Sequence, residues 1–202
     1  MRAADVELLI VPGWSGSGPD HWQSRWARHF QTARVVEQED WFAPDLESWT
    51  QRLMEAVGQA ARPVILIGHS LGVATIVHAA RALPPEKVAG AFLVAPADVD
   101  NAARWPVTQG YTFDASTGFA PLPRGPIPFP AVLVASGSDP YCSLGRAREL
   151  ASAWGAALVE AGDLGHINVA SGHGPWPEGI LRLGFFLQAL GPAGSRARAS
   201  DG

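Results

Sequence analysis

The sequence predicts a single-domain α/β protein whose six-stranded parallel sheet is covered by helices on both faces. Three observations lead to this prediction. Six short, continuous apolar runs recur along the chain, as is typical of strands that are buried on both faces. Segments with helical spacing separate these runs, and the connections between them are short. The chain has 202 residues, of which 47% are hydrophobic, so it is long enough to bury one core and short enough for one domain.

The first expected strand covers residues 6–11 and ends at Pro12-Gly13. The loop that follows contains several glycines, which indicates that its backbone approaches another group closely. A phosphate-binding loop and one half of an oxyanion hole are both compatible with such a loop. Because neither glycine pattern of the common phosphate-binding loops is present, the oxyanion hole is favoured, with the backbone N–H of Trp14 as a donor.

A helix over about residues 20–30, a strand at 33–37 and a helix over 46–60 are expected next. His21 stands at the start of the first of these helices. A histidine that caps a helix or fills the core is a more common interpretation there than a catalytic one. No histidine stands at ligand spacing from the acidic residues before the second helix, so a solvated loop is expected there instead of a metal site.

The third strand, at 64–67, leads into Gly68-His69-Ser70-Leu71-Gly72 and then into a helix over 73–81. A buried strand, the pattern G-x-S-x-G and a helix of small residues together indicate a nucleophile elbow. In such a turn the serine is held in a strained conformation, and its flanking glycines avoid collisions. We therefore expect Ser70 to be a nucleophile and the N–H of Leu71 to lie in an oxyanion hole, while the His69 side chain points away and packs.

The fourth strand, at 88–94, is followed by Asp98, and residues 101–130 then lack clear periodicity. A stretch of this kind inside a compact domain is commonly functional, but it is too short for a cap domain. Two interpretations stay open: a loop with one short helix that overhangs the site, and an ordinary surface connection. The aromatic residues near the expected site are expected to line a modest apolar pocket: Trp14, Trp105, Phe119 and Trp176.

The fifth strand, at 131–136, ends in Gly137-Ser138-Asp139-Pro140. An acidic residue just past a strand, between turn-forming residues, stands where a carboxylate that orients a histidine is expected. Asp139 is therefore favoured over Asp98 for this role.

The sixth strand, at 157–160, is followed by His166, which can extend over the sheet edge toward Ser70. His173 is the less favoured alternative because it lies further along the chain. The order Ser70, Asp139, His166 is the order found on α/β-hydrolase folds. Helices over 143–154 and 178–190 complete an expected domain of residues 1–190, and residues 191–202 are expected to form a disordered tail.

Composition excludes several classes of partner. The net charge is −4 and the basic residues do not cluster, which argues against binding to nucleic acid or to an anionic membrane surface. The single cysteine, Cys142, excludes an internal disulfide, and no secretory signal pattern is present. No apolar run is long enough to cross a bilayer. We expect a cytoplasmic protein.

Further motifs between residue 6 and about residue 190 carry a family resemblance: Pro12-Gly13-Trp14, His21-Trp22-Gln23, Gly68-His69-Ser70-Leu71-Gly72, Ser138-Asp139-Pro140-Tyr141, Gly165-His166-Ile167-Asn168 and Gly174-Pro175-Trp176-Pro177-Glu178-Gly179. The chain resembles the small serine hydrolases related to retinoblastoma-binding protein 9. The resemblance implies a compact α/β-hydrolase fold without a large cap, and a triad of Ser70, Asp139 and His166. Activity on small esters or aminoacyl amides is typical of such proteins.

The sequence therefore predicts a serine hydrolase that transfers a small acyl group to water through an acyl-enzyme, with no metal or organic cofactor. One alternative is a non-catalytic or weakly catalytic protein-binding module on the same fold. Another is different chemistry on the same triad, such as C–C bond hydrolysis or acyl transfer to an alcohol. Binding to a pocket protein is not expected, because Cys142 lacks the Leu and the Glu of an L-x-C-x-E motif.

Overall fold

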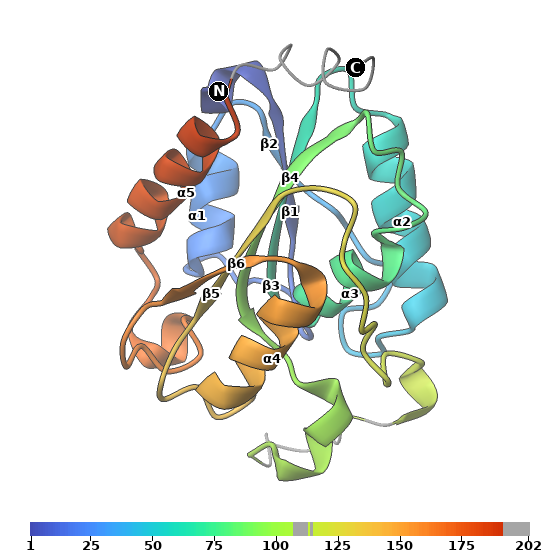
Figure 1. Ribbon diagram of the computed structural model, residues 1–202, viewed down its shortest axis with the longest axis vertical. Coiled ribbons are helices and arrows are strands. Elements are labelled where there is room, and N and C mark those ends of the chain that lie inside the picture. Colours follow the sequence, from blue (N-terminus) through green and yellow to red (C-terminus); the bar gives the residue numbers. More distant parts are fainter. Residues whose placement is uncertain (107–112, 114, 192–202) are drawn as a thin grey trace.

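A computed structural model describes residues 1–106, 113 and 115–191, which form six strands and five α-helices around one sheet (Figure 1). The strands lie in the order β2-β1-β3-β4-β5-β6, and every neighbouring pair is parallel. The predicted single-domain α/β architecture is confirmed. The strands are β1 (Glu7–Val11), β2 (Ala33–Val35), β3 (Val64–Ser70), β4 (Val88–Pro96), β5 (Ala131–Ala135) and β6 (Ala157–Glu160).

Helices cover both faces of the sheet, as the continuous apolar strands require. They are α1 (Trp22–His29), α2 (Leu46–Gly58), α3 (Leu71–Ala79), α4 (Leu144–Trp154) and α5 (Pro177–Ala189). α1 and α5 pack on one face, and α2, α3 and α4 pack on the other (Figure 1). Within β3, Leu66 belongs to the core on the α2 side and Ile67 to the core on the α1 side, since successive strand residues point to opposite faces.

The central strands extend further than their apolar runs predict. β3 continues through His69 to Ser70, which pairs with Pro96 at the end of β4. α3 begins immediately afterwards at Leu71, two residues before the predicted start. β2, in contrast, ends at Val35 instead of residue 37 and is only half-buried, as is common for an edge strand. Because all strands are parallel, their carboxyl ends meet at one edge of the sheet.

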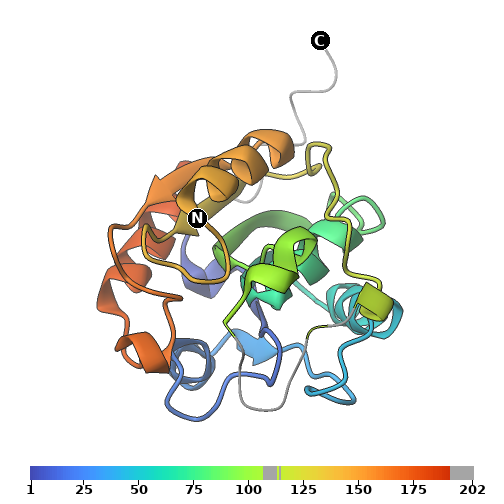
Figure 2. The ribbon, with the colours of Figure 1, turned by 90° about the horizontal axis from the view of Figure 1, so that it is seen from below.

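The segment between β4 and β5 crosses that edge. It contains two short 3-10 turns, η2 (Val99–Arg104) and η3 (Ala115–Thr117), and is otherwise irregular among the residues described. Figure 2, viewed from this edge, shows η2 near the ends of the central strands. The structure therefore favours the overhanging loop with a short helical turn over an ordinary surface connection.

Two further expectations concern the C-terminal tail and membrane-spanning helices. Except for Gly191, the predicted disordered tail at 191–202 lies outside the described residues. Within the part of the chain that the structure describes, no helix is long and apolar enough to cross a membrane.

Candidate active site

Ser70 occupies a strained turn between β3 and α3. Its backbone has φ 55° and ψ −122°, a conformation that residues other than glycine rarely adopt and that costs about 1–3 kcal/mol. A Cβ on Gly72 would overlap the carbonyl oxygen of Val11, and a Cβ on Gly68 would lie 2.7 Å from Cδ1 of Ile76. The predicted need for both flanking glycines is thus confirmed. The turn holds Ser70 at the carboxyl edge of the sheet.

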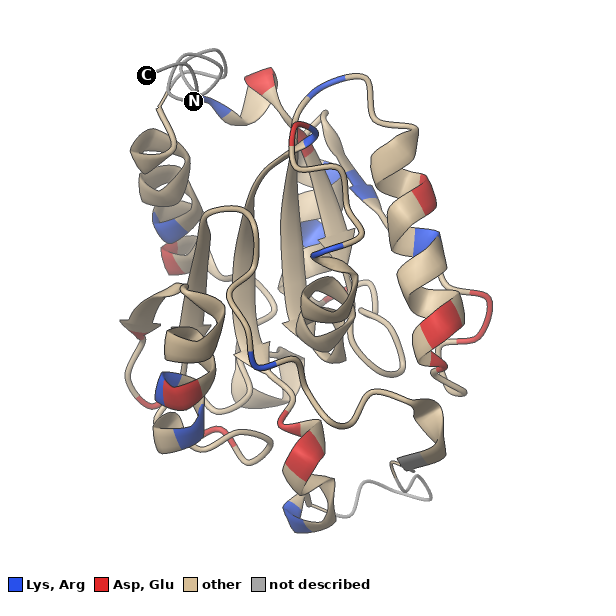
Figure 3. Cartoon of the chain, turned by 45° about the vertical axis from the view of Figure 1, so that its right-hand side comes forward, with Lys and Arg blue, Asp and Glu red and all other residues tan. Residues whose placement is uncertain are grey.

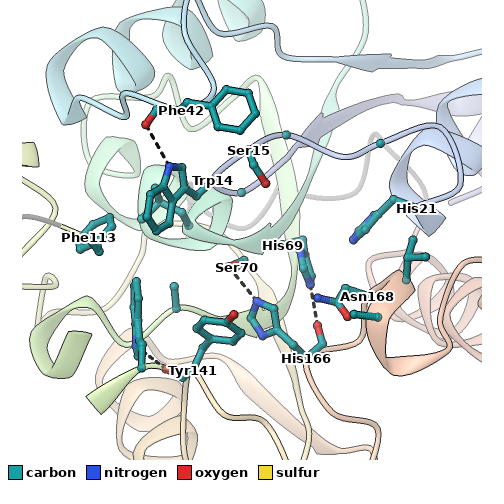
Figure 4. Close-up of a pocket in the computed structure, with 18 residues that line it drawn as sticks. Trp14, Ser15, His21, Phe42, His69, Ser70, Phe113, Tyr141, His166 and Asn168 are labelled. Atoms are coloured by element: carbon teal, nitrogen blue, oxygen red, sulfur yellow. Dashed lines mark hydrogen bonds between the residues drawn. The ribbon is translucent and has the colours of Figure 1, made fainter. Parts of the chain in front are cut away.

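A hydrogen-bond chain joins Ser70, His166 and Asp139, and Figure 4 shows its link between Ser70 and His166. The Ser70 hydroxyl lies 2.9 Å from Nε2 of His166, and Nδ1 of His166 lies 2.9 and 3.0 Å from the two carboxylate oxygens of Asp139. Asp139 also accepts the backbone N–H of Tyr141 at 2.9 Å, which fixes the carboxylate in place. The structure brings these three residues together from three different strand ends.

The two competing residues have other partners. Asp98 accepts hydrogen bonds from Arg146 Nε at 3.1 Å and from the Asn101 side chain at 2.7 Å. His173 lies with Nδ1 3.2 Å from the Ser171 hydroxyl. The geometry therefore favours Asp139 and His166, in agreement with the expectation from the sequence.

Two further histidines pack beside His166. His69 donates from Nε2 to the carbonyl oxygen of His166 at 2.8 Å, and the two ring centroids are 4.8 Å apart. The ring of His21 lies 4.9 Å from that of His69 and caps α1 by accepting the N–H of Gln23. Burial, reinforced by the nearby His166, lowers the pKa of His21 to about 4 and that of His69 well below its ordinary value. The interpretation of His21 as a helix cap is confirmed. His69 is buried, as expected, but its ring also borders the cavity beside Ser70 and packs on His166.

The loop after β1 lies tightly against the elbow. A Cβ on Gly13 would lie 2.8 Å from Cβ of Ser70 and 3.1 Å from the backbone nitrogen of Leu71. The buried side chain of Gln23 holds this loop. Its amide donates to the carbonyl oxygens of Val11 in β1 and Ile67 in β3, and its oxygen accepts the hydroxyl of Ser17 at 2.7 Å. Leu71 is the first residue of α3, so its N–H is one of the free donors at a helix N-terminus.

A cavity of about 420 Å³ opens beside Ser70. On one side it is lined by aromatic residues, which we call the aromatic wall: Trp14, Phe42, Trp105 and Phe113. The aromatic wall comes from loops, and the indole N–H of Trp105 donates to the carbonyl oxygen of Tyr141 at 3.0 Å. Of the predicted pocket residues, Trp14 and Trp105 line this cavity.

The other two predicted aromatic residues, Phe119 and Trp176, do not line this cavity. Phe119 is fully buried on the α2 side of the sheet, where its ring lies 5.8 Å from that of Trp49. Trp176 is buried on the opposite face and stacks on Trp26 with centroids 5.9 Å apart. Both extend the core, because an aromatic side chain near the site in sequence can turn inward as readily as toward a cavity.

Several lining residues were not predicted as such. Phe113 lies within the irregular stretch between β4 and β5, and Tyr141 follows Asp139 by two residues. These positions in the sequence were the available signals for the two residues. Phe42 belongs to the loop before α2, and no sequence pattern pointed to it. Ser15 and Asn168 also line the cavity.

A network of ion pairs connects the segment between β4 and β5 to α4. Arg146 of α4 pairs with Asp98 at 3.1 Å and with Asp100 at 2.6 Å, and all three side chains are largely buried. Asp100 also pairs with Arg124 at 3.0 Å and accepts the backbone N–H of Leu122. Figure 3 shows acidic residues of η2 and basic residues of α4 at this end of the molecule. The network ties η2, and hence Trp105, to the domain.

Comparison with known proteins agrees with this geometry. A family model described as "Serine hydrolase" matches residues 8–184. Comparison with curated proteins gives no significant match. Among solved structures, a protein of Pectobacterium atrosepticum described as a YdeN-like hydrolase is 34% identical, with a TM-score of 0.77 over 94% of this chain and 95% of that one.

Two more distant structures share the fold. The ydeN gene product of B. subtilis is 20% identical, with a TM-score of 0.67 over 91% of this chain and 99% of its own. Est1E from Butyrivibrio proteoclasticus, with ferulic acid bound, is 12% identical, with a TM-score of 0.64 over 91% of this chain and 88% of its own.

Proposed function

The chain belongs to the serine hydrolase family and is a hydrolase, and from this premise we propose that it cleaves a small ester or amide through an acyl-enzyme formed on Ser70. The proposal assigns the catalytic roles to Ser70, His166 and Asp139, within a single hydrolase domain of residues 1–190. The observation that carries it is the hydrogen-bond chain from the Ser70 hydroxyl through His166 to Asp139.

In the first half-reaction, Ser70 Oγ attacks the substrate carbonyl carbon while Nε2 of His166 takes the hydroxyl proton. The ionised carboxylate of Asp139 accepts the Nδ1–H, so it holds the ring in the tautomer that leaves Nε2 free to accept. The imidazolium then protonates the leaving alcohol or amine, and the acyl-enzyme remains. Water attacks this ester in the second half-reaction, with His166 again as the base.

The developing oxyanion is assigned to the backbone N–H groups of Leu71 and Trp14. Support comes from the start of α3 at Leu71 and from the tight approach of Gly13 to the elbow, which places the backbone before Trp14 beside the Leu71 nitrogen. Donors that are fixed before the reaction stabilise the transition state without reorganising during it.

The aromatic wall favours an apolar or aromatic group on one side of the scissile bond, which is compatible with esterase and with aminoacyl amidase activity. Hydrolysis of p-nitrophenyl esters of rising chain length, compared with aminoacyl amides, separates these two substrate classes.

The first test is covalent labelling by a fluorophosphonate probe, which reacts with an activated serine. We expect the wild-type protein to label and to turn over acyl substrates, while folded Ser70→Ala and His166→Ala variants do neither. Turnover that survives Ser70→Ala contradicts the assignment. Absence of labelling in the folded wild type favours the protein-binding module instead.

A further inference from the structure

The cavity has a second side with a different character. Across from Trp14, Phe113 and Tyr141, it is lined by Ser15, His21 and Asn168, which we call the polar wall (Figure 4). Its members come from two segments: Ser15 and His21 lie in the loop between β1 and α1, and Asn168 lies in the loop after β6. None of them belongs to the proposed triad, so the mechanism above leaves them without a role.

His21 presents a hydrogen-bond donor to the cavity. Its Nδ1 accepts the N–H of Gln23 at 3.2 Å, so the proton of the neutral ring resides on Nε2 at the far end of the side chain. The residue is only 7% exposed, and its ring points toward the cavity (Figure 4). Within the described part of the chain, Nε2–H has no hydrogen-bond partner. Among the described residues, Nε2 of His21 is not one of the buried side-chain atoms that lack a partner, so it is accessible from the cavity. An acceptor of a bound ligand can therefore replace water on this donor.

Asn168 and Ser15 add donors to the same side. The Asn168 side-chain oxygen accepts the backbone N–H of Ser171 at 3.0 Å, which fixes the orientation of the amide and leaves its NH₂ group for the cavity. Ser15 has φ 65°, and its backbone N–H is bound to the carbonyl of Trp41 at 2.8 Å. Among the described residues, neither the Asn168 NH₂ nor the Ser15 hydroxyl has a protein partner.

The cavity offers no charge to a ligand. None of the described lining residues is Lys, Arg, Asp or Glu. With its pKa lowered to about 4 by burial, His21 is neutral at physiological pH. A charged group bound here would lose its hydration without gaining a counter-charge. The fitting ligand group is therefore an uncharged acceptor.

We propose that His21 and Asn168, together with the Ser15 hydroxyl, form a specificity subsite that binds an uncharged oxygen acceptor of the substrate, such as an ether, hydroxyl or ester oxygen. The subsite takes the part of the substrate that extends away from the aromatic wall. This inference rests on the proposed function, because it assumes that the scissile carbonyl lies at Ser70. The preferred substrate then has an apolar half and an oxygen-bearing half, one on each side of the cleaved bond.

Isosteric substrate pairs test the subsite. In the first pair, p-nitrophenyl 3-methoxypropanoate is compared with p-nitrophenyl pentanoate, so an oxygen replaces a methylene in the acyl chain. In the second, 2-methoxyethyl phenylacetate is compared with butyl phenylacetate, so the oxygen lies in the alcohol. The readout is the ratio of kcat/KM for the ether to that for the alkyl member. Differences in intrinsic reactivity cancel when this ratio is compared between proteins.

His21→Phe is the informative variant because it keeps a ring and removes the donor. We expect it to lower the ratio about fivefold in one of the two pairs, which is the size of one neutral hydrogen bond. The pair that responds identifies which side of the ester the polar wall holds. His29→Phe is the matched control, since His29 lies exposed at the end of the same helix, and its ratio should equal that of the wild type.

Asn168→Ser provides a second variant that keeps an oxygen able to cap the turn at Ser171 and removes the amide donor. It carries the test if His21→Phe does not fold. Ratios that stay at the wild-type value in both pairs, in every folded variant, overturn the subsite. Fluorophosphonate labelling of the wild type is read separately, so failure of the proposed function is recognised independently of the subsite.

Discussion

The two components of the candidate active site are held by different kinds of structure. Ser70 is the last residue of β3, and Asp139 and His166 lie in the loops after β5 and β6, so the register of the parallel sheet sets their relative positions. The aromatic wall lies on irregular segments, and individual side-chain bonds hold it. The indole N–H of Trp14 donates to the carbonyl of Phe42 at 3.2 Å, and that of Trp105 donates to the carbonyl of Tyr141.

This difference separates the residues proposed to react from the residues proposed to select the substrate. A sheet edge fixes the reacting groups whatever the neighbouring loops are, whereas loops held by a few polar contacts can change without loss of the fold. Substitutions in the triad should therefore lower kcat, and substitutions that loosen the aromatic wall should act mainly on KM.

The largest expected effect comes from Asp139→Asn. An asparagine amide can donate to Nδ1 of His166 and so favours the tautomer that cannot accept the Ser70 proton, which lowers kcat by about 10⁴-fold. Steady-state kinetics on an activated ester measure this. The matched control is Asp98→Asn, the same change in the acid that pairs with Arg146. Equal losses in the two variants would contradict the assignment of Asp139.

The next effect concerns the loop beside the elbow. In Gly13→Ala the new Cβ would lie 2.8 Å from Cβ of Ser70 and 3.0 Å from the His69 carbonyl oxygen, so the loop must move and displace the Trp14 N–H. Loss of one oxyanion donor lowers kcat by about 10²–10³-fold. In Gly18→Ala the new Cβ has no atom within 4 Å, and kcat should stay near the wild-type value. A fully active Gly13→Ala enzyme would remove Trp14 from the oxyanion hole.

Arg146→Met tests how the aromatic wall is held. It leaves Asp98 and Asp100 largely buried without their common partner, which should lower the free energy of unfolding by about 3 kcal/mol. Urea unfolding measures this, and KM should rise more than kcat falls because η2 carries Trp105. Arg148→Met on the same helix breaks an exposed pair with Glu160 and should leave the free energy of unfolding almost unchanged, because solvent screens exposed ion pairs. Similar losses of unfolding free energy in both variants would show that the buried network stabilises the fold no more than an exposed ion pair does.

The smallest effect is a loss of stability in acid, caused by the two buried histidines, His21 and His69, that pack beside His166. The pKa of His21 is about 4 in the folded protein, compared with about 6.5 when unfolded, so the unfolded chain binds more protons between these values. Stability is therefore fully present above about pH 6.5 and falls as the pH drops toward 4. Between pH 6.5 and 5.5 this removes about 1 kcal/mol for His21, and His69, whose pKa is also lowered, acts in the same direction.

Urea unfolding at the two pH values measures this loss. His21→Phe should remove the His21 share, while His29→Phe and Arg146→Met should retain it. An unchanged pH dependence in His21→Phe would mean that His21 is not held neutral beside His69 and His166.

The sequence predicted the regular parts of the molecule well because their signals are local. Each apolar run became a strand, and Ser70 adopts the strained backbone that the elbow pattern implies. The aromatic residues were harder, since a ring at a given position in the chain reveals nothing about the side to which it turns. Phe119 and Trp176 extend the core, while Phe42 and Phe113 line the cavity. The polar wall was equally hidden, because helix capping explains His21 without reference to the cavity.

A hydrogen bond from the neighbour of Ser70 connects the proposed nucleophile to the backbone of the proposed base. His69 precedes Ser70 in the chain, and its ring donates to the carbonyl oxygen of His166 at 2.8 Å. The two reacting residues are therefore tethered by an immediate neighbour as well as by their own contact. The hydrogen-bond chain of the proposed triad is formed without a substrate, so the proposed reaction needs little reorganisation energy at its start. Binding energy from the rest of the substrate is then free to discriminate between molecules.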